Sequence, residues 1–177
     1  ASTLEDLRWL GLEWEGEPVN QSERMPEYRA AFETLRAGGQ LFPCACSRKD
    51  IREATTAPHS EDGEPIYPGT CRKNPSTINP QKSTDYNWRF RVPEGEPIEF
   101  TDAHFGPQKF IAGKDFGDFP VWQKNGLPAY QLAVVVDDAA MEITEVVRGA
   151  DLLTSTARQL LLFRALGLTP PAFYHCE

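Results

Sequence analysis

Three cysteines in the first half of the chain are spaced as ligands of a metal ion. One residue separates Cys44 from Cys46, and Cys71 follows a segment rich in Pro, Gly, Ser, Thr and Asn. Cysteines this close cannot easily bridge to each other, and cytosolic thiols stay reduced. Zinc is the usual ion of a small tetrahedral thiolate site that pins such a segment. The spacing therefore predicts a zinc site, with three unrelated buried thiols as the alternative.

A structural zinc site needs a fourth ligand. Side-chain chemistry alone favours His59, because a phenol must lose a proton before it binds and its ordinary pKa is about 10. An adjacent cation would lower that pKa strongly. The fourth cysteine, Cys176, lies far along the chain, and we expect it to be a core residue. The candidates between or near the cysteines are Tyr67, His59, Asp62 and Glu64.

Charged residues follow two apolar segments in the second half of the chain. The run Leu132–Val136 is apolar at every position, as in a central parallel strand that is covered on both faces. A second strand is predicted from Ile143 to Val147. In open α/β sheets, ligands bind beyond the carboxyl ends of the strands. The residues at those positions are Asp137, Asp138, Arg148 and Asp151.

Spacing alone leaves the roles of these residues open. The planar guanidinium of Arg148 could bind a carboxylate or a phosphate through two parallel hydrogen bonds. It could equally be a surface arginine that is paired with a nearby acid. Asp137 and Asp138 could form a turn or cap a helix instead of contacting a ligand.

The elements that must position these residues can be predicted along the chain. Leucines at helical spacing indicate a helix over Leu4–Leu10. A second helix is predicted to have Ser22 as its N-terminal cap and to end at Gly38–Gly39. The apolar positions of this helix are Tyr28, Ala31, Phe32 and Leu35.

Beyond the first two cysteines the pattern changes. The segment Ile51–Gln81 lacks sustained periodicity, which indicates a loop-rich insertion. A hairpin turn is predicted at Asn125–Gly126, with a return strand through Tyr130. A helix from about Ser155 to Leu166 completes an α/β pattern of strand, loop and helix. Alternation predicts further strands at 88–92, 98–100 and 119–123.

Composition limits the class of protein. The 177 residues are 40% hydrophobic and 25% charged, which indicates one globular body. Because the net charge is -8, a nucleic-acid partner would need a local basic face. The sequence has no apolar run near the roughly 20 residues of a membrane span and no signal-peptide pattern. We therefore expect a cytoplasmic protein with no membrane partner.

Several blocks of the sequence resemble glutamyl-tRNA synthetases, and together they extend over nearly the whole chain. The longest and most specific block is Leu127–Asp138. The others are Leu7–Leu12, Phe42–Arg48, Tyr67–Arg72, Arg148–Leu153 and Thr156–Gln159. The resemblance implies an α/β fold, namely part of a Rossmann-like class I synthetase catalytic domain with a zinc-stapled, β-containing insertion.

The same resemblance implies three parts along the chain. Residues 1–43 would be a helical part of the nucleotide-binding fold. Residues 44–130 would be a zinc-binding and strand-rich insertion, and residues 131–177 would be the second half of the Rossmann-like fold.

The resemblance also bears on the fourth zinc ligand. Discriminating glutamyl-tRNA synthetases that have this zinc close it with a Cys-x-His pair, where this chain has Cys71-Arg72-Lys73. Their shorter paralogues, the glutamyl-queuosine tRNA(Asp) synthetases, use a tyrosine four residues before the last cysteine, which is the place of Tyr67. The resemblance thus reverses the chemical preference for His59. It implies the ligands Cys44, Cys46, Tyr67 and Cys71.

For the intact enzyme, the resemblance implies activation of glutamate with ATP and Mg²⁺, followed by transfer of glutamate to the queuosine base of tRNA(Asp). Tyr130 and Arg148 occupy the family's glutamate-binding places. No catalytic residue is assigned, because the ATP-binding His-x-Gly-His and Lys-x-Ser-Lys motifs do not occur in the sequence. The chain also begins at Ala1 without a methionine. We therefore expect an internal fragment of a monomeric enzyme, inactive on its own.

Two alternatives remain open. The chain could come from a discriminating glutamyl-tRNA synthetase with an aberrant zinc site, or it could be a non-catalytic, zinc-stapled binding module. Independently of this choice, basic residues near the cysteines are predicted to meet an RNA backbone. These residues are Arg48, Lys49, Arg52, Arg72 and Lys73.

Overall fold

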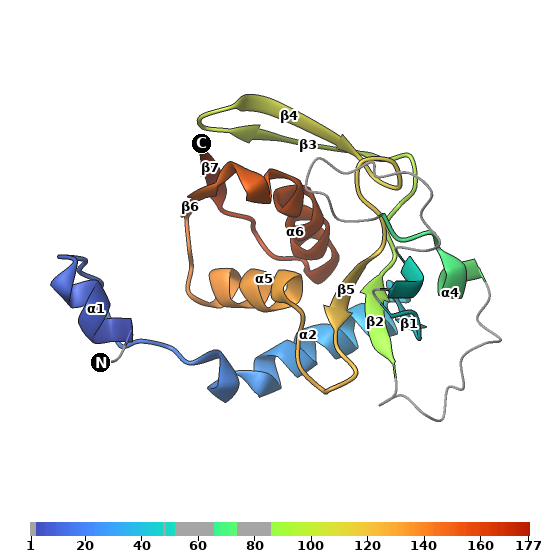
Figure 1. The fold of residues 1–177 in the computed structure, drawn as a ribbon, viewed down its shortest axis with the longest axis horizontal. Coiled ribbons are helices and arrows are strands. Elements are labelled where there is room, and N and C mark those ends of the chain that lie inside the picture. Colours follow the sequence, from blue (N-terminus) through green and yellow to red (C-terminus); the bar gives the residue numbers. More distant parts are fainter. Residues whose placement is uncertain (1–2, 48, 52–65, 74–85) are drawn as a thin grey trace.

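The computed structural model describes residues 3–47, 49–51, 66–73 and 86–177, and Figure 1 shows their arrangement. Within these ranges, seven strands form two sheets. Several predicted site residues lie outside the described residues. They are Arg48, Arg52, His59, Asp62 and Glu64.

The first sheet is antiparallel and includes the first cysteine. β1 (Leu41–Cys44) pairs with β2 (Asn87–Phe90), which pairs in turn with β5 (Phe119–Trp122). Cys44 is the last residue of β1 and lies opposite Asn87 of β2. This pairing therefore fixes the position of the first thiol relative to a buried sheet.

The second sheet joins strands from distant parts of the sequence. Its order is β4 (Gly106–Ile111), β3 (Pro97–Asp102), β7 (Ala172–Cys176) and β6 (Glu145–Gly149). β3 and β4 are antiparallel, whereas β7 is parallel to both β3 and β6. The strands expected around 88–92, 98–100 and 143–147 are confirmed, with changed ends. Strands of the segment 44–130 occur in both sheets, and the division into three parts stays a prediction.

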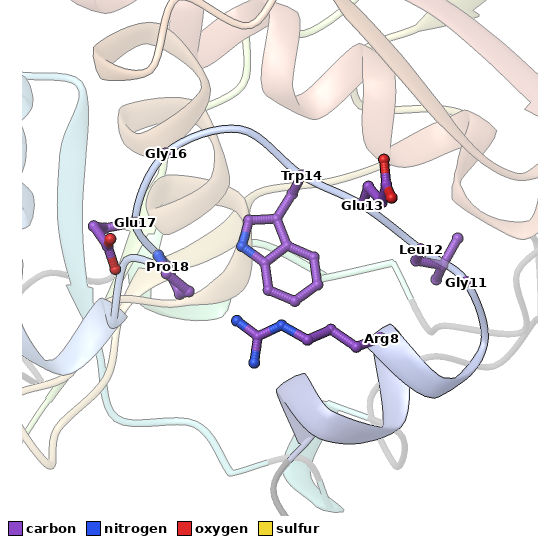
Figure 2. Close-up of a pocket in the computed structure, with 8 residues that line it drawn as sticks. All are labelled: Arg8, Gly11, Leu12, Glu13, Trp14, Gly16, Glu17 and Pro18. Carbon is purple, nitrogen blue, oxygen red and sulfur yellow. The ribbon is translucent and has the colours of Figure 1, made fainter.

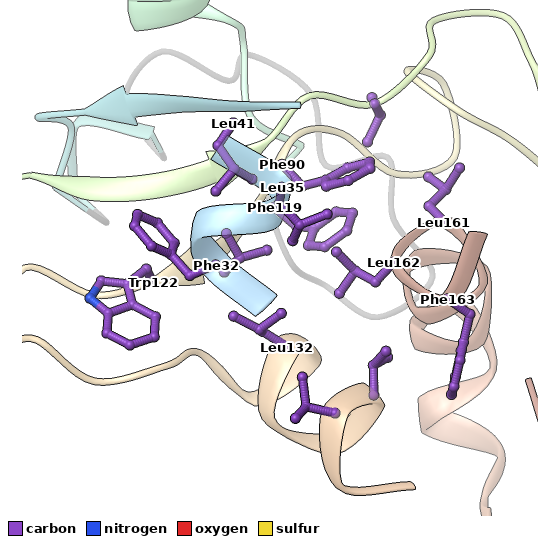
Figure 3. Close-up of a cluster of buried hydrophobic side chains, with 14 of the residues drawn as sticks. Phe32, Leu35, Leu41, Phe90, Phe119, Trp122, Leu132, Leu161, Leu162 and Phe163 are labelled. Carbon is purple, nitrogen blue, oxygen red and sulfur yellow. The ribbon is translucent and has the colours of Figure 1, made fainter. Parts of the chain in front are cut away.

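Three helices pack together and form the core, the first two against the first sheet and the third against β3 of the second sheet. They are α2 (Met25–Ala37), α5 (Tyr130–Ala140) and α6 (Leu153–Leu166). Figure 3 shows apolar side chains from these helices meeting those of β1, β2 and β5. α6 ends at Leu166 as predicted, and the next residue, Gly167, has a φ of 68° and caps the helix in the left-handed conformation.

Short helical elements also occur in the described ranges. Among them are α1 (Thr3–Trp9), α4 (Thr70–Lys73) and the 3₁₀ turns η1 (Gln21–Glu23) and η4 (Ala150–Leu152). α1 confirms the predicted first helix, buries none of its residues and lies apart from the core in Figure 1. No helix in the described ranges has the length and apolar character of a membrane span.

The prediction that Leu132–Val136 forms a strand is wrong, because this run lies inside α5. A short apolar run has no period that separates a buried strand from a buried helix. The run is apolar on two sides, as expected, and α2 and α6 pack against these sides. The prediction of a return strand through Tyr130 is also wrong, because Tyr130 is the first residue of α5. After the turn at Asn125–Gly126, the chain forms only an isolated bridge between Pro128 and Trp122.

Two smaller predictions are also corrected. Ser22 lies in η1 and does not cap α2, which begins at Met25 with a proline in its first turn and no side-chain cap. Proline is preorganised for a first helical turn, so it starts the helix without a serine. Cys176 is exposed and not in the core, because the alternation along β7 turns it outward and His175 inward.

Candidate functional site

The three predicted cysteines converge in the structure. Their sulfur atoms all lie within 4.8 Å of one another, and the Sγ atoms of Cys46 and Cys71 are 3.5 Å apart. Cys44 and Cys71 are buried. Cys71 comes from α4, so the cluster joins this short helix to the end of β1.

Tyr67 contributes an oxygen atom to the same cluster. Its hydroxyl lies 3.4 Å from the Sγ of Cys44 and 4.0 Å from the Sγ of Cys46. It also accepts a hydrogen bond of 2.7 Å from the backbone N–H of Cys71. The four predicted ligand atoms are therefore adjacent, three sulfurs and one oxygen. This donor set fits zinc, whose thiolate ligands at about 2.3 Å stand about 3.8 Å from one another in a tetrahedron.

Burial makes Cys46 and Tyr67 of this cluster resist ionisation in the absence of a cation. It raises the pKa of Cys46 to about 12, with the neighbouring thiols adding to the effect. It also raises the pKa of Tyr67, which hydrogen-bonds to Cys44 and Cys71. For Cys71, burial acts in the same direction but is outweighed by hydrogen bonds from Tyr67 and the backbone of Ala45, so its pKa is lowered. A bound cation would stabilise the ionised form of the whole cluster.

Arg89 of β2 is a further member of this site that spacing did not reveal. Its Nε donates to the Sγ of Cys44 at 3.4 Å, and its guanidinium lies over the ring of Tyr67. Its Nη1 donates to the backbone oxygen of Asp118 at 2.9 Å. The side chain is thus held inside the molecule, where it brings positive charge to the cluster. The alternation of aromatic and arginine residues in β2 predicts a strand, but it does not predict this contact.

The second predicted group forms around Arg148 on β6. Burial lowers the pKa of Arg148, while nearby Tyr130, Asp138 and Asp151 act to raise it. The structure therefore brings together both predicted glutamate-binding residues and two of the carboxylates predicted by position. Tyr130 is 51% exposed and is open to solvent at the start of α5.

Gly149 allows Asp151 to lie close to the chain beside Arg148. A Cβ atom at this position would stand 2.5 Å from the Oδ1 of Asp151. Any other residue would therefore push this carboxylate away.

Arg148 is held by two residues that lie deeper in the molecule. Its Nε donates to the Nε2 of His175 at 3.1 Å, and its Nη2 donates to the Oγ1 of Thr156 at 2.7 Å. The parallel pairing of β6 with β7 places Arg148 directly beside His175. A guanidinium has five N–H donors, so these two bonds leave three for Tyr130 and a ligand.

His175 in turn contacts the carboxylate of Asp102 on β3. Their Nδ1 and Oδ2 atoms are 2.6 Å apart, and both side chains are fully buried. Burial alone would raise the pKa of Asp102, but the backbone N–H of Phe105, the His175 ring and the backbone N–H of His104 lower it to about 2. Neither residue was predicted from the sequence. The alternation of Ala172–Cys176 could have identified the inward-facing histidine, but not its partner.

Asp137 does not belong to the Arg148 group, contrary to the prediction by position. It faces the start of α2, where the hydroxyl of Tyr28 donates to it at 2.7 Å, and the Nε of Arg24, just before this helix, donates to it at 2.7 Å. The amide of Gln21 donates to it at 3.0 Å. These bonds tie α5 to α2, so Asp137 has a structural role.

Two further features contribute no member to either group. Figure 2 shows a hollow formed by α1 and the segment after it, in which Arg8 lies beneath the ring of Trp14. None of the predicted site residues lines this hollow. Arg72, one of the basic residues expected to meet RNA, pairs with Asp118 at 2.8 Å and Glu94 at 3.6 Å. Its charge is therefore already matched within the protein.

Comparison with known proteins gives consistent results. The chain is 48% identical over 172 residues to the glutamyl-Q tRNA(Asp) synthetase of Geobacter sulfurreducens, covering 97% of this chain and 53% of that protein. It is also 48% identical over 184 residues to the protein of that name from Symbiobacterium thermophilum, covering 97% and 56%. The chain thus spans about half the length of the curated relatives it matches.

A solved structure is similar over nearly the whole chain. It is a glutamate tRNA ligase from Elizabethkingia meningosepticum in complex with its amino acid, with a TM-score of 0.76 and 25% identity. The match covers 97% of this chain and 38% of that one. The α/β fold with mixed sheets is therefore that of a glutamyl-tRNA synthetase catalytic domain. Residues 1–177 also match the model of the class I tRNA synthetases (E and Q), catalytic domain, and the chain belongs to this family.

Proposed function

We propose that this chain is the glutamate-binding and metal-stapled part of an enzyme that activates glutamate with ATP and transfers it to the queuosine of tRNA(Asp). The observation that carries the proposal is the fixed guanidinium of Arg148, which keeps three N–H donors beside the exposed Tyr130. A planar fork of donors matches a carboxylate, and a phenol can orient the amino acid beside it. The names of the relatives support the choice of queuosine and tRNA(Asp).

In the intact enzyme, the α-carboxylate of glutamate would attack the α-phosphorus of ATP and displace pyrophosphate, and the activated glutamate would then pass to the tRNA. Residues of this chain would hold glutamate for that attack, which lowers its entropic cost. Arg148 would donate to a carboxylate of glutamate, and Tyr130 would orient the amino acid. ATP and its Mg²⁺ would bind through motifs that do not occur in this sequence.

We propose zinc as the ion of the thiol cluster, held by Cys44, Cys46, Cys71 and Tyr67. Bound zinc would supply a rigid cross-link between β1 and α4. All four cysteines of the chain are free thiols, which suits a reducing compartment. This supports an enzyme that works in the cytoplasm, and we propose a monomer.

Titration calorimetry of the chain with L-glutamate and L-glutamine tests the amino-acid site. We expect binding of glutamate that is lost in Arg148→Lys, because lysine keeps the charge but lacks the planar fork. Arg164→Lys on the exposed side of α6 is the matched control and should bind normally. Equal binding by Arg148→Lys and wild type would contradict the assignment.

A second candidate is the charging of tRNA(Glu), which is favoured by the similarity to a glutamate tRNA ligase. Filter binding of the chain to tRNA(Asp) with queuosine, tRNA(Asp) without queuosine and tRNA(Glu) separates the two functions. Tightest binding to the queuosine form supports the proposal. Tightest binding to tRNA(Glu) would favour the second candidate.

A further inference from the structure

The carboxylate of Asp102 is fixed from two sides. Its Oδ1 accepts hydrogen bonds from the backbone N–H of His104 at 3.0 Å and of Phe105 at 2.9 Å. Its Oδ2 lies 2.6 Å from the Nδ1 of His175. An ionised carboxylate only accepts hydrogen bonds, so the proton between the two side chains is on Nδ1.

This arrangement determines what the other ring nitrogen of His175 can do. Nε2 lies 3.1 Å from the Nε of Arg148, which always has a proton to donate. Nε2 must therefore accept, so His175 is neutral with its proton on Nδ1. The partner of one imidazole nitrogen commonly sets the state of the other in this way. The hydroxyl of Thr156 lies 3.2 Å from the same Nε2, and its proton can share the single lone pair of this nitrogen with Arg148.

We propose that Asp102 and His175 form a buried positioning relay that sets the orientation of the Arg148 guanidinium for a carboxylate ligand. The relay crosses three neighbouring strands, β3, β7 and β6, and both of its side chains are fully buried. It holds the Nε edge of Arg148, and the remaining donors then point in a fixed direction. His175 is a positioning residue because it acts through Arg148. The identity of the ligand as glutamate rests on the proposed function.

Asp102→Asn tests the relay with almost no change in shape. The asparagine oxygen would still accept from His104 and Phe105, which turns the amide N–H₂ toward Nδ1 of His175. Nδ1 would then have to accept, and the proton would move to Nε2. Two donors would face each other at Nε2 and the Nε of Arg148, so Arg148 would turn away. Asp115→Asn is the matched control, because Asp115 also accepts a backbone N–H, at 2.6 Å from Ile111, but lies outside the relay.

Nuclear magnetic resonance of the ¹⁵N-labelled chain at neutral pH measures the tautomer of His175 and the environment of the Arg148 Nε–H directly. Its three histidines give a small set of ring signals, and His175→Gln identifies the signals of His175. We expect the Nδ1–H tautomer in wild type and Asp115→Asn, and the Nε2–H tautomer in Asp102→Asn. The Nε–H signal of Arg148 should shift only in Asp102→Asn. A wild-type Nε2–H tautomer, or an Arg148 signal that Asp102→Asn leaves in place, would overturn the relay.

Calorimetry with L-glutamate separates the relay from the proposed function. We expect Asp102→Asn to weaken glutamate binding roughly 10-fold to 100-fold, and Asp115→Asn to leave it unchanged. Unchanged binding in Asp102→Asn would overturn the positioning role. A wild-type chain that binds no glutamate would contradict the proposed function, while the resonance signals still decide whether the relay orients Arg148. If Asp102→Asn does not fold, the wild-type tautomer remains the deciding measurement.

Discussion

The guanidinium of Arg89 lies 4.3 Å from the centre of the Tyr67 ring, with its Nε directed at the sulfur of Cys44. A divalent cation bound by three thiolates and a phenolate would leave excess negative charge in a buried site. Arg89 is 9% exposed, so water screens its charge only weakly. It is therefore placed to balance that excess.

Arg89→Leu should weaken zinc binding roughly 10-fold to 100-fold, the usual size of effect for partners of metal ligands. Competition with a chromophoric chelator measures the change. Arg36→Leu is the matched control, since Arg36 also lies over an aromatic ring, that of Trp88 at 5.1 Å, but on the surface. Equal zinc affinity of Arg89→Leu and Arg36→Leu would refute the charge-balancing role.

Tyr67→Phe should remove the oxygen atom from the metal site. We expect X-ray absorption at the zinc edge to show three sulfurs and one oxygen in wild type and no tyrosine oxygen in the variant. Tyr174→Phe, at a tyrosine that contacts His104 instead, should keep the wild-type spectrum. A nitrogen in the wild-type shell would show that Tyr67 is not the fourth ligand.

Asp137→Ala should destabilise the fold by about 1–3 kcal/mol, because it leaves the buried hydroxyl of Tyr28 without its partner. Urea unfolding followed by circular dichroism measures this loss. Glu96→Ala breaks the exposed ion pair with Arg164 and should cost less than about 1 kcal/mol. Similar losses in the two variants would contradict a structural role for Asp137.

Acid should weaken the fold through Asp102. Its folded pKa of about 2 lies below the ordinary value of about 3.9. Its contribution to stability is therefore complete above about pH 4 and disappears as the pH falls toward 2. Unfolding free energies measured across this range should fall more steeply for wild type than for Asp102→Asn, which has no carboxyl group to titrate. Parallel curves would show that Asp102 contributes no such linkage.

The sequence alone predicts which residues form the thiol cluster where they are close in sequence or match a family motif. Cys44, Cys46 and Cys71 follow from spacing, and Tyr67 follows from resemblance. Asp102 and His175 could not be found in this way, because their contact depends on the parallel pairing of β3 with β7. Arg89 was assigned to a strand, but its burial depends on the position of Tyr67, which spacing does not give.

The error at α5 had a further effect on the predicted site. If 132–136 were a strand, Asp137 and Asp138 would both follow its carboxyl end. In the helix they point in different directions, so that Asp137 meets Tyr28 and Asp138 lies near Arg148. The residue types were thus sufficient to predict a charged region. Which of the two aspartates lies near Arg148 depended on whether the segment is a strand or a helix.

The place of β7 in the second sheet affects how the protein can fold as it is made. β3, β4 and β6 leave the ribosome before β7, which lies between β3 and β6 in the finished sheet. Until β7 emerges, the β3–β4 hairpin and β6 expose unpaired edges. The thiol cluster and the first sheet need only residues up to Trp122 and can assemble earlier. The metal-binding half should therefore become resistant to proteases during synthesis before the half that holds Arg148.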